Sequence, residues 1–549
     1  MTQHIELLTV LPFPGYPEWQ FRLVDRLRNL DHVTSTVFGL GDDKGVVNSR
    51  QDLYGYWQKF DARVFASDAE AAGQRGYEEL ASDTSDGRTA CQQVFRKLDT
   101  LADTVADDAY DVVLWLLPGF PPRQLLAKAR LGVWSLASVK NDALGFWELV
   151  DGVPMVTCEL FTSDSNPARH RLLGRAFAKT NHLSLTKTLR HIRAVDESLV
   201  VSKLNDIGLG VASNARLAPA EKRLTDKVGR PGAVRLVTSL SKLYGRYALN
   251  VVLRQFHRNQ WQLAYRFGGE RLSQDGLKRI APDDAGDFWA DPFIVRRDDR
   301  TMIFFEEWEG SKSKGRIVAM EIEPDGTTGP VQPVLECDYH LSYPFLFEHE
   351  GELYMIPESA DAGRVEAFRC VEYPHRWEPH AVLLDDIRAY DATLVEYDDR
   401  WWMFTAVQHN GNSTCDELWL YHAPGPFEDW TPHPANPVSL DLRFARPAGA
   451  FFEQDGHLYR PAQDCSERYG YALSIQRVLQ LDLECYTEEA VNQIMPDWAD
   501  DIGGTHTINQ ADGLTVYDCY ARRRQYRFQQ AFSRSSRNNP MKAISRGSD

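Results

Sequence analysis

Five similar segments recur at intervals of roughly 50 residues in the C-terminal half of the chain, and they constrain its fold more than any other feature. Each combines a short apolar strand, an acidic or glycine-containing turn, and a second strand rich in aromatic or β-branched residues. Such spacing is typical of one four-stranded propeller blade per repeat. A generic β-sandwich does not explain five near-equal periods. The sequence therefore predicts an all-β five-bladed propeller over residues 263–521. Its segments start at Asp291, Tyr343, Asp391, Arg446 and Thr505/His506.

The starting residues also predict a ligand site. The innermost strand of each blade lines the central channel of a propeller, so five polar side chains are expected to meet at one end of it. Aromatic side chains nearby can stack on sugar rings. We expect substrate contacts from Trp289, Tyr343, Arg446, His506 and Trp308. The fourth segment is longer than the others, which a β-bulge would absorb.

Two of the segments carry a family resemblance. Trp289-Ala290-Asp291-Pro292-Phe293 and Tyr390-Asp391-Ala392-Thr393 resemble the blade-opening motifs of five-bladed glycoside hydrolases such as arabinanases and β-xylosidases. With Tyr343-Pro344-Phe345 and Met355-Ile356-Pro357-Glu358-Ser359 between them, their order is still more similar to the N-terminal propeller of plant glucosamine inositolphosphorylceramide transferase and its bacterial relatives. The resemblance covers about 250 residues.

The hydrolase resemblance implies three acidic residues. Asp291 matches the base and Asp391 the orienting aspartate, but Arg446 stands where the acid is expected, and arginine does not give up its proton at neutral pH. Hydrolysis requires a second carboxyl group at the bond. Glu358 is our candidate for a displaced acid, with Glu306 and Glu307 as alternatives. Without such an acid, Arg446 suits a carboxylate or phosphate ligand.

The N-terminal part alternates strand-like and helix-like segments, which predicts an α/β domain with a mostly parallel sheet. We expect strands at 5–11, 33–40, 110–117 and 131–136, and helices at 17–30 and 121–129. Gly132-Val133-Trp134-Ser135-Leu136, Gly145-Phe146-Trp147-Glu148 and Pro154-Met155-Val156-Thr157 resemble the formyltransferase family. The resemblance implies formyl transfer to an amine, but Ser135 and Ala137 replace the expected Asn and His, so this chemistry lacks its general base.

Four parts are expected along the chain: a formyltransferase-like α/β domain at 1–208, a helical connector at 209–262, the propeller at 263–521 and a basic, flexible tail at 522–549. The net charge of −17 argues against nucleic acid as a partner. The sequence contains no run of about 18 apolar residues, so we expect no membrane span. None of the eight cysteines forms a C-x-x-C pair, so neither a metal site nor a cofactor is expected. With no export signal visible, we expect a cytoplasmic location.

Together these features predict a carbohydrate-recognising or carbohydrate-processing protein of cell-surface polysaccharide or glycolipid biosynthesis, with sugar bound at the propeller mouth. The expected ligand is a sugar, a sugar nucleotide or a glycolipid headgroup, and a protein of a glycan-assembly pathway is a further expected partner. Two alternatives stay open. One is a glycosyltransferase or glycosidase using Asp291, Asp391 and a displaced Glu. The other, less favoured, is a sugar-amine formyltransferase. The sequence does not decide whether the protein is an enzyme.

Overall fold

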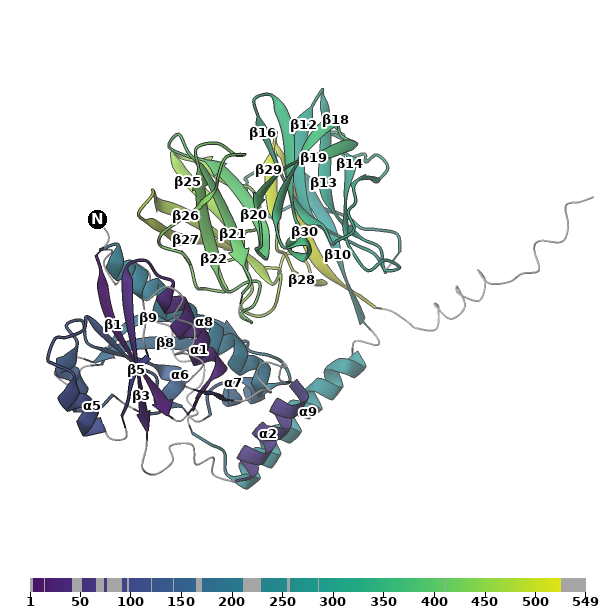
Figure 1. Ribbon diagram of the computed structural model, residues 1–549. Coiled ribbons are helices and arrows are strands. Elements are labelled where there is room, and N and C mark those ends of the chain that lie inside the picture. The colour runs from purple at the N-terminus through teal and green to yellow at the C-terminus, as the bar shows by residue number, and fades with distance from the viewer. Residues whose placement is uncertain are drawn as a thin grey trace, which may run out of the picture.

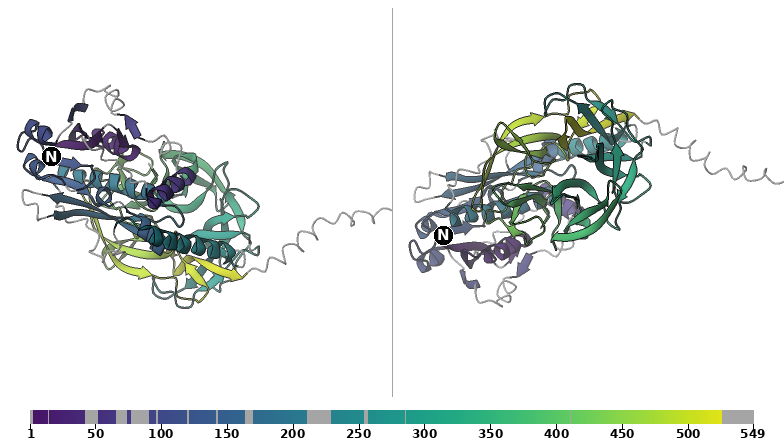
Figure 2. Two further views of the ribbon diagram at one scale, coloured as in Figure 1. Left: turned by 90° about the horizontal axis from the view of Figure 1, so that it is seen from below. Right: turned by 90° about the horizontal axis from the view of Figure 1, so that it is seen from above.

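The computed structural model describes residues 3–13, 15–41, 52–65, 74–76, 91–95, 98–119, 121–141, 143–163, 170–210, 229–253, 257–284, 286–409 and 411–524. The described chain forms an α/β domain and a β-propeller, which lie against one another (Figure 1). Figure 2 shows the same two bodies from below and from above. Among the described residues, no helix combines the length and apolarity that crossing a membrane requires.

The α/β domain is built on a seven-stranded sheet with the order β5-β3-β1-β6-β7-β8-β9. The first five strands in this order are parallel, and β8 and β9 are antiparallel to their neighbours. This confirms the predicted mostly parallel α/β architecture. The strand bounds are β1 Ile5–Phe13, β3 Val33–Gly41, β5 Cys91–Phe95, β6 Val112–Trp115, β7 Val133–Leu136, β8 Met155–Ser163 and β9 His170–Lys179, and a separate pair joins β2 Gly15–Pro17 to β4 Gln74–Gly76.

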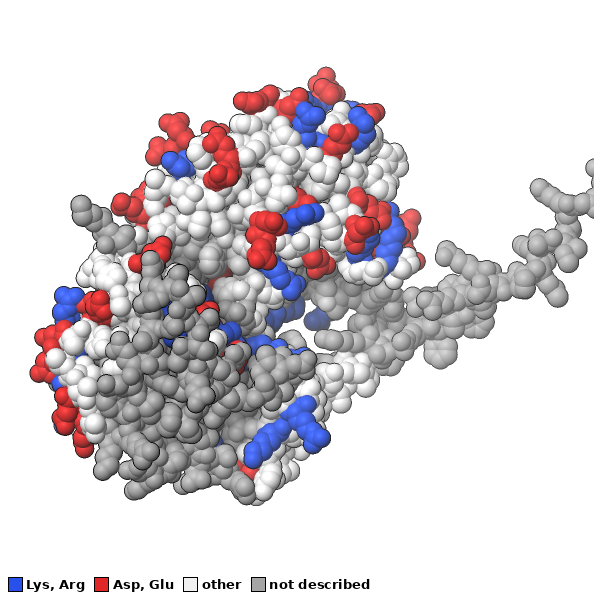
Figure 3. Space-filling view, viewed as in Figure 1, with Lys and Arg blue, Asp and Glu red and all other residues white. Residues whose placement is uncertain are grey.

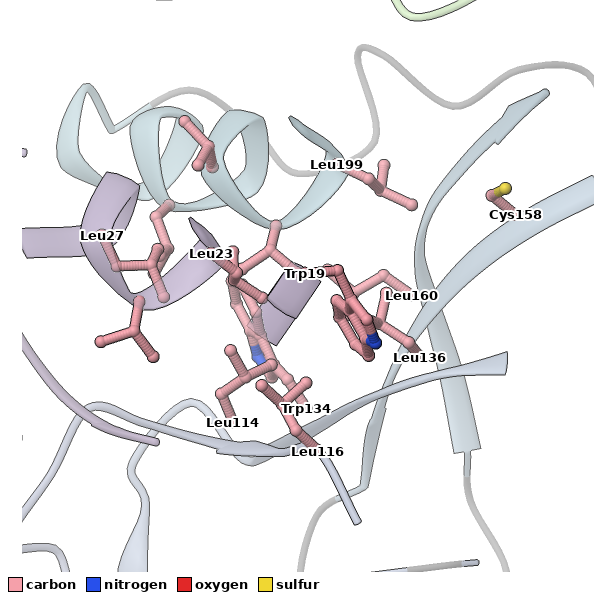
Figure 4. Close-up of a cluster of buried hydrophobic side chains, with 14 of the residues drawn as sticks. Trp19, Leu23, Leu27, Leu114, Leu116, Trp134, Leu136, Cys158, Leu160 and Leu199 are labelled. Atoms are coloured by element: carbon pink, nitrogen blue, oxygen red, sulfur yellow. The ribbon is translucent and has the colours of Figure 1, made fainter. Parts of the chain in front are cut away.

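Both faces of this sheet are covered, as a parallel sheet requires. Residues alternate along β1, so Leu7 and Leu11 join one apolar core while Leu8 and Val10 join the other. Helices α1 and α8 cover the first face, where Trp19 and Leu199 pack (Figure 4). The helices are α1 Glu18–Arg28, α2 Leu53–Phe65, α5 Leu98–Thr104, the 3-10 helix η1 Arg123–Lys128, α6 Ala137–Lys140, α7 Phe146–Asp151, α8 Leu185–Gly208 and α9 Ala233–Leu253.

The propeller consists, among the described residues, of four four-stranded blades and a fifth assembled from both ends of the domain. Strand β10, which precedes the first blade, pairs with the last strand, β30, from His257↔Arg524 to Phe267↔Leu514 and so closes the ring. The predicted propeller is confirmed, and β10 extends it into the range expected to be connector. The blades are β12 Phe288–Arg297 to β15 Gln332–Leu335, β16 Ser342–His349 to β19 Arg376–Leu384, β20 Ala389–Glu396 to β23 Thr431–Pro432, β24 Phe452–Gln454 to β27 Tyr486–Ile494, and β28 Ile502–Gly504, β29 Ile508–Ala511 and β30 Leu514–Arg524 with β10 His257–Phe267 and β11 Lys278–Ile280.

The first four blades each have two middle strands, which are β13 Arg300–Trp308, β14 Arg316–Glu321, β17 Glu352–Glu358, β18 Val365–Glu372, β21 Trp401–Val407, β22 Leu418–Ala423, β25 His457–Asp464 and β26 Ala472–Leu481. The turn after each starting strand uses left-handed backbone, which two-residue hairpin turns need. Both turn residues have positive φ in all five blades: Asp298-Asp299, Glu350-Gly351, Asp398-Asp399, Asp455-Gly456 and Asp512-Gly513.

Helix α8 forms much of the contact between the two bodies. Its side chains are buried along most of its length, and Ser198 Oγ donates to Glu417 Oε1 of the propeller at 2.5 Å. Asn205 Nδ2 donates to the carbonyl of Asn436 at 2.9 Å. Beside it, a mixed apolar cluster joins Met155 and Phe177 of the sheet to propeller residues Cys415, Leu442 and Cys465. The two bodies therefore share a buried interface.

Candidate functional site

The predicted starting residues meet because every blade is irregular at the same place. The strand register shifts between Ala290 and Phe293, between Ser342 and Phe345, and between Tyr390 and Thr393. Pairing also slips between Gly504 and Ile508. In the fourth blade it slips between Pro447 and Phe452, so the expected bulge is present. A bulge re-aims the side chain that it carries.

Three of these starting residues have left-handed backbone, with φ of 53° at Asp291, 42° at Tyr343 and 55° at Asp391. Residues other than glycine adopt this conformation at a cost, which the surrounding contacts must offset. The Tyr343 hydroxyl provides one such contact. It hydrogen-bonds with Thr393 Oγ1 at 2.9 Å and accepts a bond from the Gly449 amide at 2.7 Å. Tyr343 therefore ties the second, third and fourth blades together.

A buried cluster of charges joins the first blade to the fifth. Thr507 Oγ1 donates to Asp291 Oδ1 at 2.7 Å, and His506 Nε2 lies 3.8 Å from the same oxygen. His506 Nδ1 contacts Asp518, whose carboxylate also accepts from the amides of Asp291, His506 and Thr507. Burial alone would lower the pKa of His506, but Asp518 and Asp291 outweigh it and raise that pKa to about 9. His506 is therefore a buried cation at neutral pH.

A second ion pair joins the third blade to the fourth. Arg446 Nε donates to Asp391 Oδ2 at 2.6 Å, and its Nη2 donates to Oδ1 at 3.1 Å. Gln463 Nε2 adds a bond to Asp391 Oδ2 at 2.9 Å. This two-pronged geometry is that of a strong arginine–carboxylate pair. The arginine that replaces the expected acid thus holds the third-blade aspartate.

Two further carboxyl groups occupy equivalent places in the first and second blades, since Glu306 pairs with Ala290 and Glu358 with Ser342. Burial raises the pKa of Glu358 to about 7, although its carboxylate accepts from Ser342 Oγ at 2.9 Å and from the Ala360 amide at 2.6 Å. Burial, followed by the charge of Asp291, raises the pKa of Glu306 well above its usual range. Burial therefore favours the protonated form of Glu306 more than it would be favoured in an exposed carboxyl group.

Aromatic rings surround these charges. The guanidinium of Arg446 lies between the rings of Tyr390 and Tyr469, 5.2 and 5.1 Å from their centroids. Trp261 stacks on His506 at 4.1 Å, with 14° between the planes. Arg446 and His506 are buried, whereas Tyr469, which touches both, is 39% exposed. Tyr469 consequently covers them on the solvent side.

On the Glu306 side, Trp308 stacks on Phe288 with centroids 5.8 Å apart, and it also packs against His340. His340 Nε2 lies 3.5 Å from Glu306 Oε1. We name these rings the aromatic collar, defined by Trp261, Phe288, Trp308, Tyr390 and Tyr469. It stands over a charged floor, defined by Asp291, Glu306, Glu358, Asp391, Arg446, His506 and Asp518.

Most of the predicted residues belong to this assembly. Asp291, Asp391, Glu358, Arg446 and His506 form part of the floor, and Trp308 belongs to the collar. Tyr343 braces the blades. Trp289 instead packs in the core between the first and fifth blades, with its indole donating to Glu307 Oε1 at 3.2 Å. Its predicted contact with a substrate stays a prediction.

Four residues of the site were not predicted from the sequence: Asp518, Gln463, Tyr469 and Trp261. None of them starts a repeat: they come from partner strands and from a loop. A usable signal existed for Asp518, because it lies on the strand that pairs with the fifth starting segment.

One trio in the floor has the donor set for a cation. Among the described residues, Asp291, His506 and Asp518 each offer a ligand atom, and these atoms lie within 4.8 Å of one another. A metal ion would compete there with the proton that His506 holds, because a coordinating imidazole must be neutral.

The comparisons with known proteins concern the propeller. Residues 280–502 match the family model described as glucosamine inositolphosphorylceramide transferase 1, N-terminal. This confirms the predicted resemblance of the propeller. Glucosamine inositolphosphorylceramide transferase 1 of Oryza sativa subsp. japonica is 34% identical over 223 residues, which are 39% of this chain and 30% of that protein. The Arabidopsis thaliana protein of the same name is 33% identical over 208 residues, covering 37% and 27%. The chain thus spans less than a third of these relatives.

Solved structures with a similar arrangement include a family 117 glycoside hydrolase from Zobellia galactanivorans, at 12% identity and a TM-score of 0.32, covering 50% of this chain and 97% of that one. Another is an α-L-arabinanase from Cellvibrio cellulosa, at 14% identity and a TM-score of 0.29, covering 37% and 77%. TM-scores this low support no conclusion about fold or function. The propeller is assigned from its strand pairing. The formyltransferase-like interpretation of residues 1–208 is not confirmed by these comparisons.

Proposed function

We propose that the propeller binds the sugar of a glycan or glycolipid headgroup at its mouth, in glycolipid or cell-surface polysaccharide biosynthesis. The observation that carries this is the aromatic collar over the charged floor. Aromatic rings pack on the apolar faces of sugars, and convergent polar groups fix the orientation of their hydroxyls. The names of the plant relatives make an amino sugar and an inositolphosphoryl headgroup the first ligands to test.

Sugar binding should depend on the collar. We expect saturation-transfer NMR or calorimetry to detect binding of glucosamine, an inositol phosphate or a glucosamine-containing headgroup by the full chain. Tyr469→Ala should weaken it about tenfold, because one stacking surface is lost. Tyr397→Ala is a matched control, since Tyr397 is 40% exposed in the turn after β20. Undiminished binding in the Tyr469 variant, or equal losses in both, would contradict the proposal.

Glycosyl transfer or hydrolysis is the second candidate, because burial raises the pKa of two floor carboxyl groups toward neutrality. Burial raises the pKa of Asp291 to about 6, with His506 opposing it, whereas the pKa of Glu358 is about 7. Carboxyl groups with a pKa near neutrality are suited to exchange protons with a substrate. Asp391, held by Arg446, would orient them.

For this candidate, the pH dependence has a defined sign. Activity should rise as pH increases through about 6, where Asp291 ionises, and fall as it passes about 7, where Glu358 loses its proton. Turnover of aryl glycosides or activated sugar donors would measure it. Glu358→Gln should cost about 10²-fold or more. Activity that Glu358→Gln leaves intact would remove Glu358 from the reaction.

A further inference from the structure

Helices α2 and α9 carry exposed apolar side chains on the surface of the α/β domain. On α2 these residues recur every three or four positions and so lie on one side of the helix. The adjoining side of the same helix buries Tyr54 and Trp57 against Phe146. The exposed row consists of Leu53, Tyr56, Phe60 and Val64, which are 48–59% exposed.

Helix α9 packs beside α2, and it too has one buried apolar side and one exposed apolar side. Leu236 and Leu243 are buried toward α7, whereas Val234 and Val237 face solvent. From Tyr244 onward almost every apolar side chain of α9 is exposed, and apolar residues occupy most of the circumference of this end of the helix. These residues are Tyr244, Tyr247, Leu249, Val251, Val252 and Leu253, at 39–57% exposure. Exposed apolar rows of this size mark interaction sites.

The charges on the same two helices are almost all positive. No acidic residue occurs in Ala233–Leu253, which contains Arg235, Lys242 and Arg246. Helix α2 exposes Lys59 and Arg63, while its one acidic residue, Asp61, is buried. Asp61 Oδ2 accepts bonds from the hydroxyls of Ser184 and Thr186. The whole chain has a net charge of −17, so the charge on these two helices is opposite in sign to that of the chain.

In Figure 3, blue side chains lie among white ones over the region where Figure 1 labels α2 and α9. Lys242 also pairs with Asp151 at 3.2 Å, which removes part of the positive charge. Lys59, Arg63 and Arg235 are also exposed, and the guanidinium of Arg235 lies 4.4 Å from the centroid of the Trp147 ring.

We propose that α2 and α9 form a surface that docks on an anionic lipid bilayer without crossing it. Helices with an apolar face flanked by lysine and arginine lie in the headgroup region, where apolar side chains reach the acyl boundary and cations meet lipid phosphates. The exposed tyrosines, Tyr56, Tyr244 and Tyr247, suit this interface. Membrane docking goes beyond the proposed sugar binding and does not depend on it.

A second copy of the chain fits the same surface less well. In a two-fold dimer the same patch meets itself, so the basic residues of α2 and α9 would approach their own copies. Like charges facing each other oppose association. Anionic headgroups would instead neutralise Lys59, Arg63 and Arg235. Charge complementarity therefore favours the bilayer as the occupant.

Vesicle flotation of the full chain tests this proposal. We expect binding to phosphatidylcholine vesicles that contain phosphatidylglycerol, weaker binding to phosphatidylcholine alone, and weakening by added salt. The triple variant Phe60→Gln, Leu249→Gln, Val252→Gln should reduce binding about tenfold or more, because three inserted apolar side chains are lost. Its basic residues, including those after Arg524, are unchanged, so the loss would be assigned to the apolar surface.

The matched control is the triple variant Val382→Gln, Leu479→Gln, Val491→Gln, which changes propeller side chains of 45–55% exposure. It should bind vesicles as the parent does, and circular dichroism should show both variants folded. Absence of binding to anionic vesicles, or equal loss in both variants, would overturn the proposal. So would a dimer, seen by light scattering, that only the α2/α9 variant dissociates, because a second copy would then be the occupant.

Discussion

Replacing Arg446 by methionine is expected to lower the free energy of unfolding of the propeller by about 3–5 kcal/mol. Asp391 is 1% exposed and accepts two hydrogen bonds from Arg446. Methionine keeps much of the side-chain volume but leaves a buried carboxylate with Gln463 as its remaining side-chain donor. Uncompensated buried charge is among the costliest single changes in a protein. Chemical denaturation of the full chain would measure the loss.

The double variant Asp391→Asn, Arg446→Met separates pairing from packing. Removing both charges should restore a large part of the loss, because no unpaired charge then remains. As a surface control, Arg279→Met breaks a 2.8 Å pair with Asp501 whose side chains are 35% and 44% exposed, and it should cost less than about 1 kcal/mol. If the double variant is as unstable as Arg446→Met alone, Arg446 stabilises the propeller by packing and not by its charge.

The fold was more predictable than the site. The repeat spacing and the acidic or glycine-containing turns are local features of the sequence, so the five strand–turn–strand segments were predicted, whereas the left-handed backbone of their turns was seen first in the structure. Ring closure by β10 could not be predicted this way, because it joins His257 to Arg524 across the whole domain. Helix α8 was also missed. It is buried between two bodies, so its polar and apolar residues do not separate onto two faces.

The convergence of the starting residues was predicted from the sequence, whereas their contacts with one another were not. The starting residues converge as expected, because each lies where the strand pairing of its blade is irregular. The same irregularity explains Trp289: two residues apart on a regular strand would share a face, but the register shift after Ala290 separates Trp289 from Asp291. The partners of Asp291 and Asp391 come from other blades. Such long-range pairs leave no local pattern in a single sequence.

The fifth-blade histidine should make stability depend on pH above neutrality. His506 is 2% exposed, and Asp518 and Asp291 hold its pKa at about 9 against an unfolded value of 6.5. A pKa raised by folding means that the folded state binds the proton more tightly. The stabilisation is therefore fully present below about pH 6.5 and is lost as pH rises through about 9. Its size is on the order of 3 kcal/mol.

The difference in free energy of unfolding between the parent and His506→Gln should change with pH, and this change would measure the contribution of His506. The variant leaves Asp518 and Asp291 without their cation, so we expect it to be less stable by a few kcal/mol at pH 6.5. Near pH 10 the parent imidazole is neutral too, and the difference should shrink to the packing change alone. His457→Gln, at an exposed site in the fourth blade, should match the parent at both values. A difference that stays constant between pH 6.5 and 10 would mean that His506 is neutral in the folded protein. The carboxylates of Asp291 and Asp518 would then need another counter-charge. A metal ion bound by Asp291, His506 and Asp518 is the candidate.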